Sequence, residues 1–164
     1  MHQGLRGIDK FKIVTGCNPA LLATTAGDGD FVSMKNYDRC TMILTVLNAT
    51  TVTGGAVTLL QASDVAGTGA KALAFTTMWA NTDTAASDTL VETAVTSNTF
   101  TTSTTNSKAL KYVIEVQASD LDVAGGFDCL RIDVASSVAS VGNVEYILHE
   151  PRYASPIAVS AITD

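Results

Sequence analysis

Hydrophobic and polar residues alternate along several stretches of the chain. From Asp38 to Leu47, the apolar side chains Cys40, Met42, Leu44 and Val46 fall on one side and mainly polar ones on the other. A period of two places successive side chains on opposite faces of a strand. The segment therefore predicts a strand with one buried and one wet face, although Ile43 and Leu47 interrupt the polar side.

Three later segments alternate in the same way: 110–117, 127–134 and 144–149. Shorter apolar stretches bounded by Gly, Asn, Asp and Ser predict further strands at 56–62, 73–80, 89–95 and 98–102. Thr53, Gly54 and Gly55 predict a turn that joins 38–47 and 56–62 as a hairpin. About eight short strands with one wet face each must bury the other face against a second sheet, so we expect an all-β, jelly-roll-like antiparallel β-sandwich.

Six apolar positions on these strands are expected to be buried, because each lies on the apolar side of a half-wet strand. They are Leu44, Val46, Ile114, Val116, Ile132 and Leu148. Cys40 and Cys129 are also expected to pack in the core as small buried thiols.

The prolines divide the chain. Pro19 lies near the start and Pro151 and Pro156 near the end, so the residues between can carry uninterrupted strands. We divide the chain into an N-terminal arm with the segment that leads into the body (1–36), a β-sandwich body (37–150) and a C-terminal tail (151–164).

Composition and charge narrow the class of protein. Thr, Val and Ile number 23, 16 and 8 among 164 residues, a β-branched bias that favours strands. The net charge of −6 and pI of about 4.7 argue against a nucleic-acid partner. No apolar run is long enough for a membrane span, and the first residues lack the apolar centre of a signal peptide. We expect a soluble protein made in the cytoplasm, with no membrane partner.

Candidate chemistry is sparse. The chain has three cysteines without a CxxC pair, only two histidines, and no GxSxG context for a nucleophile. Asp28 with Asp30, and Asp120 with Asp122 and Asp128, have spacings that could donate oxygens to Ca²⁺, but turn chemistry explains them better. We expect no enzyme activity, no cofactor and no metal. Trp79 is either a core or interface residue, or a platform on which a sugar stacks.

The order of features resembles a family of small jelly-roll proteins that decorate or cement the capsids of tailed bacteriophages. The resemblance is carried by the segment from Phe11 to Ala49, by GGAVTLLQASD (54–64) and by NVEYILHEPRYASPI (143–157). It implies a structural virion protein on the outer capsid surface, commonly a homotrimer, that stabilises contacts between major capsid subunits. A carbohydrate-binding sandwich of a tail fibre or lectin-like protein is the alternative.

The two ends of the chain are the candidate contact regions. The first twelve residues are locally basic, whereas the rest of the chain is acidic. Apolar side chains in the arm can anchor it on a partner, and its basic residues can pair with carboxylates of that partner. The tail, which begins at Pro151, is proposed to contribute to the same contacts. An edge strand of the same domain is the alternative interpretation of the arm. The predicted contacts to the major capsid protein or to sister subunits are Leu5, Arg6, Ile8, Lys10, Phe11, Lys12, Ile13, Pro151, Arg152 and Tyr153.

Overall fold

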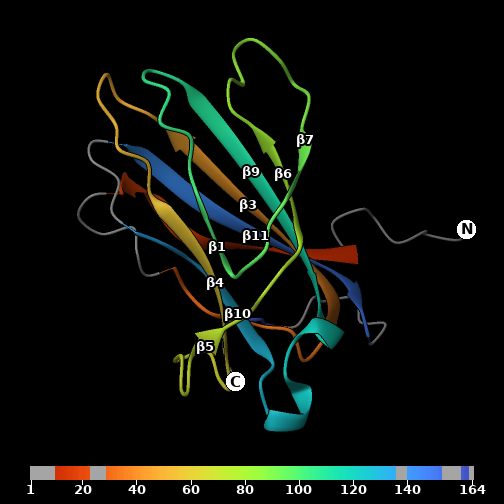
Figure 1. Ribbon diagram of the computed structural model, residues 1–164. Coiled ribbons are helices and arrows are strands. Elements are labelled where there is room, and N and C mark those ends of the chain that lie inside the picture. The colour runs from red at the N-terminus through yellow and green to blue at the C-terminus, as the bar shows by residue number, and fades with distance from the viewer. Residues whose placement is uncertain (1–9, 23–28, 136–139, 153–159, 163–164) are drawn as a thin grey trace, which may run out of the picture.

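The computed structural model describes residues 10–22, 29–135, 140–152 and 160–162. These residues form eleven strands in two antiparallel sheets (Figure 1). The strands are β1 (Phe11–Leu21), β2 (Val32–Ser33), β3 (Tyr37–Leu47), β4 (Ala56–Ala62), β5 (Lys71–Ala72), β6 (Thr77–Asn81), β7 (Val91–Ala94), β8 (Thr99–Thr101), β9 (Ala109–Gln117), β10 (Cys129–Val134) and β11 (Val141–Pro151). Two single-turn 3₁₀ segments, η2 (Ala118–Asp120) and η3 (Val123–Gly125), join β9 to β10.

The strand order is that of a jelly roll. The six-stranded sheet has the order β1-β11-β3-β9-β6-β7, and the second sheet has the order β2-β10-β4-β5, with β8 also paired to β4. If β5, β6 and β7 are set aside, eight strands remain. They pair first with last (β1 with β11), second with seventh (β2 with β10), third with sixth (β3 with β9) and fourth with fifth (β4 with β8). This nested antiparallel pairing is how a jelly roll winds, so the predicted fold class is confirmed.

The remaining strands form an insertion between β4 and β8. Strand β5 adds to the second sheet, and the β6–β7 hairpin extends the six-stranded sheet beyond β9. The hairpin and its loop project beside the upper end of β9 in Figure 1. As a result, β1 and β7 are the two edges of the six-stranded sheet.

The core lies between the inner faces of the two sheets. All six positions predicted to be buried are at most 2% exposed, which confirms the assignment of faces. Cys40 and Cys129 are both fully buried, as expected. Cys129 packs in a small second cluster with Phe31 and Ala62, apart from the main core.

The predicted hairpin between residues 38–47 and 56–62 is wrong. The strands β3 and β4 are correctly located, but they belong to different sheets, and the Gly54–Gly55 segment carries the chain from one sheet to the other. Gly54 has a φ of 74°, and its backbone crosses close to the carbonyl of Thr102. A turn signal between two strands does not distinguish a hairpin from a crossover between sheets, because both need permissive backbone.

Residues 11–21 form part of the body. Strand β1 pairs with β11, and β2 pairs with β10, so the sandwich begins well before residue 37. Of the N-terminal segment 1–36, residues 1–9 and 23–28 lie outside the described part of the chain. The alternative interpretation, an edge strand of the same domain, therefore holds for Phe11, Lys12 and Ile13. No helix in the described residues has the length and apolar character needed to cross a membrane.

Candidate interaction surface

Strand pairing brings the two ends of the chain together. In the β1–β11 ladder, Phe11 lies opposite His149 and Ile13 opposite Ile147. Strand β11 then ends at Pro151, and Arg152 follows it. The candidate contact residues from both ends of the sequence thus meet at one corner of the six-stranded sheet, which we call the β1–β11 corner (Lys10–Ile13, Pro151 and Arg152).

The side chains at this corner differ in exposure. Ile13 is 52% exposed, a large value for an isoleucine in a strand, and Lys10 is also exposed. Phe11 and Lys12 are partly buried. Leu5, Arg6, Ile8 and Tyr153 lie outside the described residues.

Ion pairs within the chain compensate several charges near the corner. The Arg152 Nε donates to Asp38 Oδ1 at 2.6 Å, so this arginine already has a carboxylate partner. Arg39 donates to Glu115 and also lies 3.5 Å from Glu150, and these carboxylates raise the pKa of its guanidinium. Exposed ion pairs of this kind contribute little to the stability of the fold.

The outer edge of β1 is only partly protected. Its second half contains Pro19 and two register shifts, after Thr15 and after Cys17, and the amide of Asp30 donates to the carbonyl of Gly16 at 2.8 Å. Bulges, proline and covering loops are the devices that keep edge strands from pairing with other chains. The first half of β1, from Phe11 to Thr15, pairs regularly with β11, and among the described residues it has none of these features. The regular half of the edge is also the half that belongs to the corner.

A second exposed apolar group lies at the other end of the same sheet. Leu21 pairs with Val141, and Val141 pairs with Leu47, so the three side chains form a row across β1, β11 and β3 on one face. Each is between 39% and 55% exposed. The sequence carried a signal of this row, because Leu47 breaks the polar side of its strand, but the row could not be assembled without the register.

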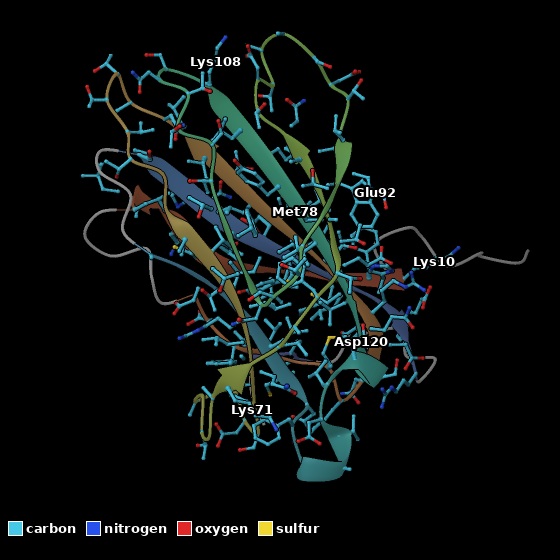
Figure 2. The ribbon with its side chains drawn as sticks, in the orientation of Figure 1. Lys10, Lys71, Met78, Glu92, Lys108 and Asp120 are labelled. Carbon is cyan, nitrogen blue, oxygen red and sulfur yellow. The ribbon has the colours of Figure 1, made fainter. Side chains whose placement is uncertain are left out.

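A cleft opens between β6 and β9 at the same end of the sheet as the corner. It is lined by Leu73, Ala74, Phe75, Thr76, Thr77, Trp79, Glu115, Val116 and Asp120 and has a volume of about 390 Å³. Figure 2 shows Asp120 beyond the lower end of β9, whereas Lys108 lies at the upper end. Trp79, one of the residues singled out in the sequence, therefore borders a cavity that contains two carboxylates.

The described residues offer little covalent or metal chemistry. No group of three or more His, Cys, Asp or Glu side chains in the described ranges could hold a metal ion. The three cysteines are free thiols. Burial raises the pKa of Cys40, and burial followed by the nearby charge of Asp30 raises the pKa of Cys17. Both thiols are thus held in the protonated, weakly nucleophilic form.

Comparison with known proteins gives one structural likeness. No protein-family model matches the chain, and no curated protein matches it. The crystal structure of the SPBc2 prophage-derived protein YomS is similar, with 13% sequence identity and a TM-score of 0.45 over 85% of this chain and 93% of that one. At this identity and TM-score, the likeness carries no inference about function.

Proposed function

We propose that this chain is a non-catalytic structural protein of a tailed-phage virion, which binds the outer surface of the capsid and stabilises contacts between major capsid subunits. In this proposal it acts as a homo-oligomer, a trimer, and the β1–β11 corner contacts the capsid. The observation that carries the proposal is the meeting of the two predicted contact regions at this corner, through the β1–β11 ladder.

The surface of the corner suits a protein partner. Ile13 offers an apolar anchor that the chain does not cover with its described residues, and the regular edge of β1 beside it offers backbone donors and acceptors. An edge strand of this kind can accept a strand from another chain. Lys10 adds an exposed positive charge, which favours an acidic surface on the partner.

The overall charge supports the same class of protein. With a net charge of −6, the chain is repelled by nucleic acid, as suits a protein outside a shell that encloses packaged DNA. Only 16% of the residues are charged, so a broad surface can be buried against neighbours with limited desolvation of charges.

Co-sedimentation with empty capsids tests the proposal. The purified chain, mixed with empty capsids of a phage that carries its gene, should sediment with them at saturable occupancy. A variant that lacks residues 1–9, which keeps the whole of β1, measures the contribution of the preceding residues. Sedimentation equilibrium of the free chain should give the mass of a trimer. A chain that stays in the supernatant with every capsid form would contradict the proposal, and a monomeric mass would remove its trimeric part.

A further inference from the structure

We propose that the cleft between β6 and β9 binds a neutral saccharide, with Trp79 as the stacking surface and Glu115 and Asp120 as hydrogen-bond acceptors. The inference goes beyond the proposed capsid role and does not depend on it.

The cleft exists because β6 separates from β9. The two strands pair only from Trp79 to Asn81, opposite Val113 to Lys111. Before Trp79 the chain turns toward the second sheet, where the amide of Leu73 donates to the carbonyl of Leu59 at 3.0 Å. The crossing of residues 73–77 from one sheet to the other leaves a gap beside the end of β9. Its volume, about 390 Å³, lies within the range of about 300–1,000 Å³ typical of small-molecule sites.

Trp79 faces away from the sandwich core. Its cross-strand partners are Val113 on β9 and Glu92 on β7, and neither belongs to the buried core. The next residue back, Met78, is buried and points to the core side. Trp79 is partly exposed, so the indole presents part of a flat apolar surface on the outer face of the sheet. Such a surface can stack against the apolar face of a sugar ring.

The two carboxylates are each fixed through one oxygen. Glu115 Oε1 accepts from Arg39, and Asp120 Oδ2 accepts the backbone N–H of Gln117 at 2.9 Å. Within the described ranges, the second oxygens, Oε2 of Glu115 and Oδ1 of Asp120, make no hydrogen bond. An acceptor that is already oriented loses little entropy when it binds a hydroxyl group.

The charge of the cleft favours a neutral polyhydroxylated ligand. Arg39 compensates Glu115, so this carboxylate acts as a hydrogen-bond acceptor rather than an isolated charge that needs a cation. Asp120 and the nearby Glu92 would repel an acidic sugar. The hydroxyls of Thr76 and Thr77, which also line the cleft, can donate to or accept from sugar hydroxyls. A lysine or arginine side chain from a protein partner, held by the indole and the carboxylates, is the competing ligand.

The fluorescence of the single tryptophan tests the proposal directly, because Trp79 is the chain's only indole. The free protein is titrated with maltose, cellobiose and diacetylchitobiose, with glucuronic acid as the acidic probe and Nα-acetyl-lysine amide as the cationic probe. We expect a saturable change with at least one neutral saccharide, at a Kd of about 1 mM or below, and none with the other two probes.

Two matched variants assign the effect to the cleft. In Asp120→Asn, the amide oxygen can keep the bond to Gln117 while its NH₂ replaces the acceptor that faces the cleft. We expect saccharide binding to weaken about tenfold. Glu92→Gln removes the same charge beside Trp79 but outside the cleft lining, and should leave the affinity unchanged. Trp79→Ala, followed by calorimetry, should abolish binding, and Trp79→Phe should retain part of it.

The proposal is overturned if no neutral saccharide gives a saturable change, or if the two charge variants have equal effects. Saturation by the lysine probe alone would assign the cleft to a cationic side chain instead. All titrations use the free protein, so the absence of saccharide binding would not affect the capsid co-sedimentation test. Likewise, the absence of capsid binding would not affect the outcome of the titrations.

Discussion

The two edges of the six-stranded sheet differ in length, origin and protection. Strand β1 is eleven residues long and is the first strand of the jelly roll, whereas β7 is four residues long and belongs to the insertion. Both carry an exposed β-branched apolar residue, Ile13 at 52% and Val91 at 62%. The short β7 presents little backbone for another chain to pair with, while the first half of β1 presents a regular edge. Among the described residues, β1 is therefore the longer and more regular of the two edges, which is why the proposed capsid contact is placed there.

Both edges depend on the same sandwich core, so truncating a core side chain should have the largest effect on stability. Ile114 on β9 is 1% exposed and lies in the main cluster between the sheets. Ile114→Ala should lower the free energy of unfolding by about 2–5 kcal/mol, the cost of lost burial and of the cavity left behind. Denaturant unfolding followed by circular dichroism measures the change. A loss near zero would show that β9 does not face the core.

Gly16 lies on β1 next to the core residue Tyr146. A Cβ at this position would come within 2.3–2.9 Å of the Tyr146 ring, which is fully buried and whose hydroxyl accepts the amide of Ile132 at 3.1 Å. Gly16→Ala should destabilise the fold by about 1–3 kcal/mol, because the ring cannot move without disturbing the core. Gly126→Ala is unsuitable as a control because of its φ of 83°, so Gly29→Ala, whose nearest atoms are 3.0 Å away or more, serves instead and should cost less. Equal losses for both variants would contradict this account of Gly16.

Acid should loosen the insertion that carries β7. Asp83, at the start of the β6–β7 loop, accepts from Lys108, and this bond is the largest cause of its lowered pKa. A lowered pKa means that the contribution to stability is complete above the unfolded value near 3.8 and is lost as the pH falls through the folded value. Asp64 and Asp122 are lowered as well, so the melting temperature should fall below about pH 4.

The Asp83→Asn variant measures how much the Asp83–Lys108 pair contributes to the fall in melting temperature at low pH. It should melt slightly lower at neutral pH and lose less on acidification than the parent protein. Thermal melts at a series of pH values measure both. An unchanged pH profile in the variant would show that the Asp83–Lys108 pair does not contribute.

Substitutions at the two edge positions should change stability least. Ile13→Lys and Val91→Lys each place one positive charge on an exposed edge, and each should alter the free energy of unfolding by no more than about 0.5 kcal/mol. Chemical denaturation provides the check. A larger loss for Ile13→Lys would show that this side chain contributes to the fold and is not available to a partner.

The strands of the body were predictable, and their partners were not. Residues 56–62 match β4 at both ends, and the alternation at 110–117 and 144–149 identified the buried faces of β9 and β11. Period-two patterns report which face of a strand is buried, but pairing depends on contacts between distant residues. Strand β1 escaped prediction because Gly16, Pro19 and its bulges interrupt the alternation.

The candidate surface was predicted only in part. The composition of the two ends indicated contact regions, yet their meeting depends on the β1–β11 ladder, which joins residues more than a hundred positions apart. The cleft beside Trp79 depends on where β6 leaves β9, and no local pattern marks this point. The sequence pattern predicted that Asp120 is a turn residue, and its carboxylate does accept the backbone N–H of Gln117. Its position in the cleft follows only from the fold.

Capsid occupancy of the two edge variants tests whether the β1–β11 corner binds the capsid. Ile13→Lys and Val91→Lys make the same chemical change on β-branched residues of similar exposure, one at the β1–β11 corner and one on the opposite edge. In co-sedimentation with empty capsids, we expect Ile13→Lys to lose most of its occupancy and Val91→Lys to bind like the parent protein. Equal occupancy of the two variants, or a loss confined to Val91→Lys, would contradict the assignment of the β1–β11 corner as the capsid-binding surface.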